Sequence, residues 1–264
     1  MTEIDFYDVF QGQVAAFLLV LTRSSGIFFI SPFFGSLNVP YRIRAAVAFM
    51  FALILFPVVM KEYVIQAPAT LIMFAFTVAK ELLIGWLIGL VAYIVLSAVS
   101  MAGKIMDMQV GFAVVQMMDP TTNQQTGLIG TFLYNLTIIY FIVTNGHHVI
   151  ISALAESFRV VPIDLMVWNT SLPELITDLT AGIFLNGMKI AMPVTFAILM
   201  VNVGMGILAR TMPQMNIFVV GIPMHLMIGM ATVAMILPFY ILFLDVIFNE
   251  IYANISIALK ALAP

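Results

Sequence analysis

Six long apolar stretches set the strongest limit on how this chain can fold. They cover residues 14–34, 45–59, 69–101, 127–154, 181–209 and 217–248. A transmembrane helix needs about 20 predominantly apolar residues. The chain is 63% hydrophobic and only 9% charged, whereas soluble domains carry roughly 25% charged residues. The sequence therefore predicts an all-α integral membrane protein.

Several stretches are longer than one membrane crossing requires. As a single helix, residues 69–101 would extend roughly 50 Å, whereas the hydrocarbon core is about 30 Å thick. Five prolines fall within or at the edges of the stretches, namely Pro32, Pro57, Pro193, Pro223 and Pro238. Because proline removes a backbone donor and usually kinks or ends a helix, we expect kinked, broken and overlong helices. Irregular backbone at membrane depth must be buried in protein or line a water-filled cavity, which favours an assembly or a conduit.

Charged side chains lie inside the apolar stretches rather than only between them. Lys80 and Glu81 interrupt the third stretch, Lys189 lies in the fifth and Asp245 lies late in the sixth. A charge at bilayer depth costs at least about 2.5–3.5 kcal/mol, so it normally faces protein or water instead of lipid. We therefore expect these helices to have protein partners.

Glu81, Gly85 and Gly89 recur every four residues and so share one helix face. The glycines would let another backbone approach closely, and the acid would make a polar contact between helices. Gly-xxx-Gly alone is a frequent pattern that usually indicates only helix packing. Glu81 on the same face indicates, in addition, a polar contact between helices. Lys80 projects about 100° away and needs a different partner. We predict a helix contact face here.

Asn202, Gly206 and Arg210 repeat this spacing in the fifth stretch. Arg210 ends the expected helix. Two interpretations remain open, a second contact face or an interfacial arginine that extends to the lipid head groups at a helix C-terminus.

Residues 101–126 are rich in methionine and amide side chains and match neither a membrane helix nor a charged loop. Lys104 and Asp107 could pair along one helical turn, Gly111 permits a break, and Asp119-Pro120 is a turn signal. Methionine supplies flexible, polarizable surface that can seal around variable shapes. The methionines concerned are Met106, Met108, Met117 and Met118. The segment is a candidate gate or plug, although methionine in a membrane protein is usually filler.

No catalytic or metal-binding motif emerges from the sequence. His147 and His148 are adjacent, and we expect adjacent imidazoles on a helix to diverge. The chain has no cysteine and only one further histidine, so structural hydrogen bonding is favoured over metal ligation. We expect no enzyme activity, no metal and no cofactor. The chain also has no basic cluster of the kind that binds nucleic acid.

Several segments together resemble one known family. They are residues 23–32 (RSSGIFFISP), 80–89 (KELLIGWLIG), 102–112 (AGKIMDMQVGF), 145–148 (NGHH) with 157–158, and 209–223 (ARTMPQMNIFVVGIP). The chain resembles FliR, the flagellar member of the type III secretion export-gate subunits (the FliR/SctT family). The last segment is the most specific, since its order of residues has no generic membrane explanation. Lys104 is a departure, because the family pattern favours glutamine there.

The resemblance implies a core subunit of the flagellar export gate in the bacterial inner membrane, within the basal body. One copy would assemble with FliP and FliQ, near FlhB and FlhA, in a helical multi-subunit assembly that extends toward the periplasm and contacts membrane lipid. Unfolded flagellar proteins would be the transported substrate. Residues 1–175 would form a FliP-like portion and residues 176–264 a FliQ-like helical hairpin.

The resemblance also implies roles for particular residues. The plug, residues 106–125, would include Met106, Asp107, Met108, Gly111, Phe112, Val115, Met117, Met118, Asp119 and Pro120. Buried charges and assembly contacts would come from Lys80, Glu81, Gly85, Gly89, Lys189, Arg210 and Asp245. The family pattern would include Asn145, Gly146, His147, His148, Pro213, Asn216, Phe218, Gly221 and Pro223.

Three alternatives remain. The chain could belong to a virulence type III secretion system instead of a flagellar one. It could be a secondary small-solute transporter in which Lys80, Glu81 and Lys189 form a site among broken helices. An intramembrane enzyme would require catalytic groups that converge in a pocket, and the sequence offers none.

Overall fold

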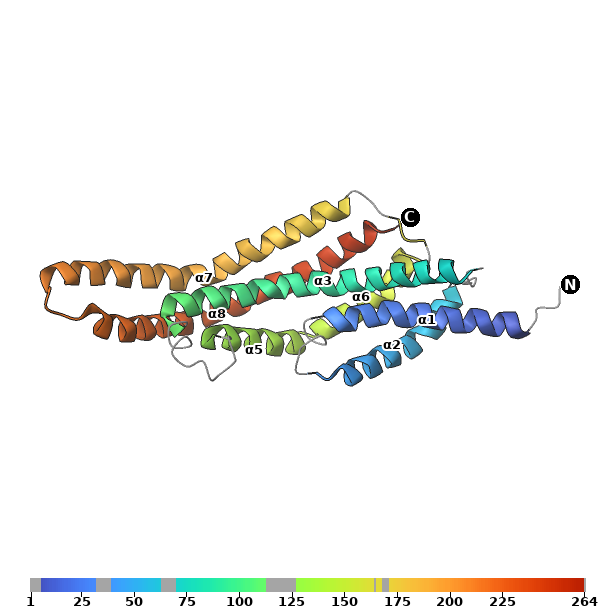
Figure 1. Ribbon diagram of the computed structural model, residues 1–264, viewed down its shortest axis with the longest axis horizontal. Helices are drawn as coiled ribbons and strands as arrows, with labels where there is room; N and C mark the ends of the chain where they lie inside the picture. The colour runs from blue at the N-terminus through green and yellow to red at the C-terminus, as the bar shows by residue number, and fades with distance from the viewer. Residues whose placement is uncertain are drawn as a thin grey trace. The chain divides into compact units, whose positions relative to one another are not determined.

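The regular structure of the chain is α-helical throughout the residues described (Figure 1). The computed structural model describes residues 6–31, 39–62, 70–112, 127–163, 165–167 and 171–263. Its helices are α1 (Phe6–Ile30), α2 (Tyr41–Glu62), α3 (Leu71–Val110), α5 (Leu128–Val143), α6 (Gly146–Val160), α7 (Ser171–Thr211) and α8 (Ile217–Lys260). The prediction of an all-α integral membrane protein is confirmed.

Five of these helices are long and apolar enough to cross a membrane. The spans are Gly12–Ile30, Tyr41–Lys61, Leu71–Val110, Leu172–Thr211 and Val219–Lys260. α3 has 40 residues, α7 has 41 and α8 has 44. At 1.5 Å per residue each extends roughly 60 Å, about twice the thickness of a hydrocarbon core. The expectation of overlong helices is confirmed.

Proline does not end the helices, contrary to the expectation of broken ones. Pro57 lies within α2, Pro193 within α7, and Pro223 and Pro238 within α8, and each helix continues past its proline. A membrane helix tolerates the lost hydrogen bond because neighbouring helices, hydroxyl side chains and small backbone adjustments can satisfy the freed carbonyl. Pro32 lies outside the described residues.

The break in the fourth apolar stretch occurs at an asparagine. α5 ends at Val143, and Asn145 adopts the left-handed conformation with φ 58° and ψ 29° before α6 begins at Gly146. Asparagine tolerates this conformation better than most residues. The two helices are bent by 64° relative to each other. Neither is long enough to span alone, so the pair is a bent span or a re-entrant segment.

The chain forms two compact units. Unit 1 comprises residues 1–94, 145–178 and 249–264, and unit 2 comprises residues 95–144 and 179–248. α3, α7 and α8 each contribute residues to both units. The predicted division between residues 175 and 176 separates a FliP-like from a FliQ-like portion. That division rests on resemblance to other subunits and not on contacts within the chain, so it stays a prediction.

Aromatic contacts join α1 to α2 in unit 1. The rings of Phe28 and Phe51 stack with centroids 5.1 Å apart. Phe17 makes edge contacts with Phe49 and Phe56, each at 5.6 Å between centroids. Such pairs add about 0.5–1.5 kcal/mol each beyond the burial of their area. They fix α2 beside α1.

The core of unit 2 draws apolar side chains from four helices. The fully or nearly buried members are Val99, Ala102, Met106 and Val110 of α3, Ile129 and Leu133 of α5, Ile190, Ala191, Val194 and Ile198 of α7, and Val233, Tyr240 and Leu244 of α8. The hydroxyl of Tyr240 shares a hydrogen bond of 2.5 Å with Thr137. Unit 2 is therefore a bundle in which α7 and α8 each turn one face inward.

Candidate functional site

Arg23 of α1 and Glu81 of α3 form a buried ion pair in unit 1. The Nε of Arg23 lies 2.5 Å from the Oε2 of Glu81, and both side chains are 0% exposed. A buried charge pair offsets the cost of its desolvation only when its geometry is good and further hydrogen bonds support it. The polar contact between helices predicted at Glu81 is found, and its partner is Arg23.

The same guanidinium binds the C-terminal end of α6. Its Nη1 donates to the backbone oxygens of Ser157 at 2.8 Å and Val161 at 2.9 Å. Its Cζ lies 4.2 Å from the centre of the Phe158 ring. The last carbonyls of a helix lack partners within the helix, and a cation there also interacts favourably with the helix dipole. Arg23 therefore joins α1, α3 and α6 through one side chain.

Glycines bring the backbones of α1 and α3 together beside this ion pair. A Cβ on Gly85 would overlap the carbonyl oxygen of Arg23, and a Cβ on Gly26 would come within 2.9 Å of the α3 backbone. One on Gly89 would lie 3.2 Å from the carbonyl oxygen of Ile27. The helix contact face predicted from the four-residue spacing is confirmed. Its role in assembly with other chains stays a prediction.

The contacts of Arg23 and Glu81 position three helices, α1, α3 and α6. The Nη2 of Arg23 and the Oε1 of Glu81 are buried without a hydrogen-bond partner among the described residues. No group of three or more His, Cys, Asp or Glu that could hold a metal occurs in that part of the chain. The surrounding groups are the ring of Phe158, backbone carbonyls and the hydroxyl of Ser157, which lies 3.3 Å from the Nη1 of Arg23 and donates to the backbone oxygen of Leu154. The arrangement suits a structural joint.

Sequence reasoning missed Arg23 as a buried charge. The signal was present, because Arg23 is a cation inside the first apolar stretch, and the rule applied to Lys80 and Glu81 applies equally to it. What the sequence does not give is the pairing, since 58 residues separate Arg23 from Glu81. Lys80 is only half-buried and does not share this face of α3.

Asp107 of α3 holds the first turn of α5 in unit 2. Its Oδ1 accepts the backbone N–H of Ile129 and its Oδ2 that of Gly130, both at 2.9 Å. A carboxylate at this place satisfies free N–H groups and interacts favourably with the helix dipole. The predicted pairing with Lys104 is wrong. Among the described residues no ion pair joins the two, because the start of α5 occupies both carboxylate oxygens and Lys104 is exposed.

The remaining residues of the predicted plug fall in different environments. Met106 is fully buried in the core of unit 2, whereas Met108 is 71% exposed. Gly111 has φ +97°, which favours glycine, and Phe112 packs against the core. The other members lie outside the described residues, namely Val115, Met117, Met118, Asp119 and Pro120. The plug stays a prediction.

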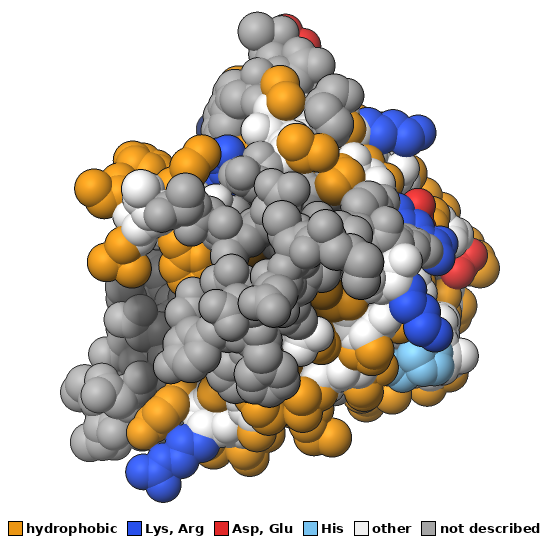
Figure 2. Space-filling view, turned by 90° about the vertical axis from the view of Figure 1, so that its right-hand side faces the viewer, with side chains coloured by type: hydrophobic (Ala, Val, Ile, Leu, Met, Phe, Trp, Pro, Cys, Tyr) orange, Lys and Arg blue, Asp and Glu red, His pale blue; other side chains and the backbone are white. Residues whose placement is uncertain are grey.

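Three of the predicted assembly charges lie on the surface of the chain. Lys189 and Arg210 of α7 and Asp245 of α8 are all exposed. Asp245 accepts a hydrogen bond of 3.0 Å from the hydroxyl of Tyr140. Large hydrophobic side chains are exposed along the same helices. Figure 2 shows a different face, the right-hand side of Figure 1, where hydrophobic side chains also lie beside Lys and Arg side chains. These charges are not buried within this chain, and their burial against another stays a prediction.

His147 and His148 begin α6 in unit 1. Their ring centroids lie 4.3 Å apart, so the two imidazoles do not diverge as expected. Both lie in the first turn of α6, which follows the left-handed Asn145. Gly146, between them and the bend, is buried. These residues of the family pattern form the bend.

The other residues of the family pattern lie at the junction of α7 and α8. Pro213 and Asn216 are exposed in the connection, Pro223 is in α8, and the side chain of Phe218 lies outside the described residues. Gly221 is buried and faces Met205 of α7, whose Cε would lie 3.6 Å from an added Cβ. Pro213 and Asn216 thus lie in the connection between α7 and α8, and Phe218, Gly221 and Pro223 lie in the first two turns of α8.

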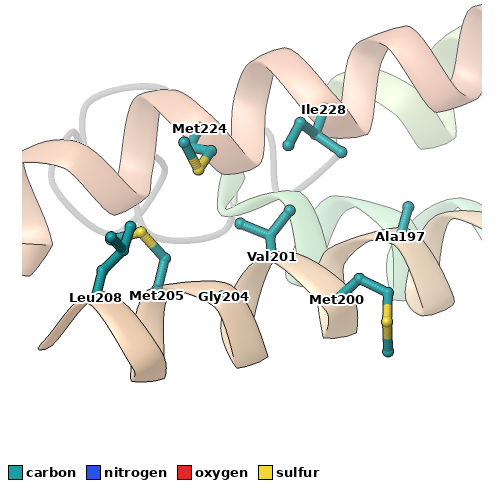
Figure 3. A pocket seen from close by; sticks show the side chains of 8 residues that line it. All are labelled: Ala197, Met200, Val201, Gly204, Met205, Leu208, Met224 and Ile228. Carbon is teal, nitrogen blue, oxygen red and sulfur yellow. The ribbon is translucent and has the colours of Figure 1, made fainter. Parts of the chain in front are cut away.

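An apolar groove of about 450 Å³ follows this connection. It is lined by Ala197, Met200, Val201, Gly204, Met205 and Leu208 of α7 and by Met224 and Ile228 of α8. Figure 3 shows Val201 and Met224 pointing toward one another across it. The groove contains no charged side chain, so it has no group that would orient a polar ligand.

The overlong apolar helices define an integral membrane protein in which five of the described helices are long and apolar enough to cross a bilayer. Residues 14–251 match the family described as bacterial export proteins, family 1. This match covers most of the chain, and the chain belongs to that family. The family is described by export and not by a chemical reaction.

Curated relatives agree with this assignment. The chain is 34% identical over 217 residues to the flagellar biosynthetic protein FliR of Bacillus subtilis (strain 168), covering 81% of this chain and 83% of the relative. It is 32% identical to the protein of the same name from Caulobacter vibrioides, covering 87% and 90%. For the Escherichia coli (strain K12) protein of that name the identity is 28%, covering 88% of each chain. The resemblance to FliR is confirmed.

Proposed function

We propose that the chain is a core subunit of the flagellar export gate. In this proposal one copy assembles with FliP and FliQ in the bacterial inner membrane, near FlhA and FlhB, and the assembly extends toward the periplasm. Unfolded flagellar proteins pass through the resulting channel. Membership of an export family and relatives named as flagellar biosynthetic proteins support this class of function.

The observation that carries the proposal is the incomplete burial of α7 and α8. In an apolar 18-residue window of α3, 67% of the residues are buried, compared with 33% for α7 and 22% for α8, the same share as for α2. Lipid could cover apolar side chains on these helices, but it leaves a charge uncompensated. Lys189 and Asp245 are exposed on them. Further protein subunits would cover both kinds of side chain.

The proposal assigns a different role to unit 1. The contacts of Arg23 with Glu81 and Ser157 hold α1, α3 and α6 together without help from another chain. Unit 1 therefore has a rigid centre of its own, while the two helices of the predicted FliQ-like hairpin offer contact surface. In this view residues 106–125 provide the closure of the channel, and Asp107 anchors the start of that segment.

The secondary transporter has no observation in its favour. It requires Lys80, Glu81 and Lys189 to form one site, but the carboxylate of Glu81 is bound to Arg23 inside unit 1. The virulence system is disfavoured by the flagellar names of the relatives.

A secretion assay tests the proposal. In a strain of its species from which this gene is deleted, we expect flagellin to be absent from the medium and the cells to be non-motile. A plasmid copy of the wild-type chain should restore both. Normal flagellin secretion in the deletion strain would contradict the proposal.

A further inference from the structure

A cavity of about 200 Å³ in unit 2 contains a single charged side chain. Lys189 and Pro193 of α7 line it, together with Ile236, Phe239 and Phe243 of α8. One ordered water needs only roughly 10–15 Å³ of such space, so the cavity can admit a side chain. Its walls are mostly aromatic and aliphatic, which strengthens any charge interaction formed inside it.

The ammonium group of Lys189 has no acidic partner within the described chain. Asp245 of α8 accepts its hydrogen bond from Tyr140 instead. Lys189 takes part in neither the Arg23–Glu81 nor the Arg159–Glu156 ion pair. Lys189 therefore carries an uncompensated positive charge beside an apolar cavity.

Pro193 adds a hydrogen-bond acceptor at the same place. Proline has no N–H, and within α7 it removes the bond that would reach the carbonyl of Lys189, four residues earlier. The residue thus offers both an ammonium donor and a backbone carbonyl freed from its helical partner. Both are next to the cavity that Pro193 itself lines.

Exposed apolar side chains continue the surface on both sides of Lys189. Leu185, Met192 and Phe196 are 60%, 54% and 60% exposed. With Lys189 they follow the spacing i, i+4, i+7 and i+11, which is one stripe of a helix and the pattern by which a second helix is recognised. We call these four residues the Lys189 stripe.

The bilayer alone cannot cover this stripe. Between Asp178 and Arg210, Lys189 is the only charged residue of α7, and the uncharged stretch around it is longer than the roughly 20 residues that a hydrocarbon core accepts. If the whole stretch lies in the core, Lys189 is exposed to lipid. If the core begins after Lys189, Leu185 is exposed to water. A protein on the stripe removes both costs.

We propose that a membrane helix of a second polypeptide docks on the Lys189 stripe and places an aspartate or glutamate side chain against Lys189 at the cavity. This inference rests on the proposed function, which supplies the partner chains, and it specifies the chemistry of one contact. The carboxylate neutralises the ammonium group, and apolar side chains of the same helix cover Leu185, Met192 and Phe196.

Site-specific cross-linking in the assembled complex tests this inference. The full chain, carrying the photoreactive residue p-benzoylphenylalanine at Met192, is expressed together with FliP and FliQ of its species, and the cross-linked peptide is identified by mass spectrometry. We expect a cross-link to a partner helix that contains Asp or Glu. Lys189→Met should lower its yield at least tenfold, and Lys189→Arg should retain it.

Controls separate a lost contact from a folding defect. Lys260→Met removes the same charge from the exposed end of α8 and should leave the yield unchanged. Lys189 is exposed on the isolated chain, so Lys189→Met alone should keep the wild-type unfolding temperature. In a final variant, Lys189→Glu should be rescued by Lys at the acidic position of the partner.

Each other outcome overturns the inference in a recognisable way. A cross-link whose mass matches a phospholipid would assign the stripe to lipid head groups. An unchanged yield in Lys189→Met would show that the lysine is not recognised. If the wild-type chain does not copurify with FliP and FliQ, the proposed function fails as well, whereas copurification with an unaffected Lys189→Met variant removes only this inference.

Discussion

The guanidinium of Arg23 and the carboxylate of Glu81 meet in a fully buried ion pair that joins α1 to α3. The same arginine holds the end of α6 through Ser157 and stacks on Phe158. Three of the sequence segments that carry the family resemblance therefore converge on one side chain. Arg23 and Glu81 thus hold α1, α3 and α6 together.

Removing one partner of this pair should be strongly destabilising. Glu81→Gln or Arg23→Met leaves the other charge buried and unpaired, which typically costs about 3–5 kcal/mol. We expect a marked fall in the unfolding temperature of the purified chain in detergent. Arg159→Ala is the matched control, because Arg159 pairs with Glu156 at 3.8 Å on the surface and such pairs contribute about 0–1 kcal/mol. Equal effects of the buried and exposed variants would contradict the assignment.

Gly85→Ala should destabilise the same joint without changing any charge. The added Cβ would overlap the carbonyl oxygen of Arg23, so α1 and α3 would have to separate and lengthen the ion pair. We expect a loss of about 1–3 kcal/mol, as for overpacked cores. At Gly182 of α7 an added Cβ meets nothing within 4 Å. Gly182→Ala should therefore be neutral or stabilising, since alanine favours helix by up to about 1 kcal/mol. Comparable losses in the two variants would rule out the close contact.

The sequence predicted the individual helices better than it predicted which helices pack against one another. Apolar length alone predicted an overlong third helix, but its predicted end at residue 101 is wrong, because α3 continues to Val110. The spacing of Glu81, Gly85 and Gly89 predicted a contact face correctly. It could not name α1 as the opposing helix, since periodicity describes one helix at a time and a pairing between distant segments leaves no local signal.

The errors have physical reasons as well. The prediction that proline breaks these helices holds for helices in water, where the carbonyl left without its hydrogen-bond donor usually kinks or ends a helix. α8 instead continues through both Pro223 and Pro238. The predicted pairing of Asp107 with Lys104 followed from their spacing of three residues, since sequence reveals only pairs that are close along the chain. A helix N-terminus that begins after the intervening segment satisfies Asp107 instead, at Ile129 and Gly130.

Asp107→Ala should loosen the start of α5. Loss of a carboxylate that accepts helix N–H groups costs about 0.5–2 kcal/mol. We expect faster hydrogen exchange in peptides that cover Ile129 and Gly130, and a smaller effect for Asp107→Asn, which keeps one acceptor oxygen. Lys104→Ala serves as the control because Lys104 is exposed and not paired with Asp107. Unchanged exchange at Ile129 and Gly130 in Asp107→Ala would refute the capping role.

Deletion of residues 113–118 should make the membrane permeable to small ions while assembly is retained. The prediction follows from the proposed plug, and it spares Phe112, which packs against the core of unit 2. Ion leakage is measured by membrane potential in cells that express the complete complex. Replacing the six residues with a Gly/Ser segment of equal length controls for the shortening of the chain. Intact impermeability with normal assembly would remove the plug assignment.

Native mass spectrometry of this chain, alone and coexpressed with FliP and FliQ of its species, tests the central claim most directly. Exposed charges on α7 and α8 require protein partners if these helices lie in a membrane. The account predicts one large complex that contains a single copy of this chain. A monodisperse free chain that associates with neither partner would contradict it.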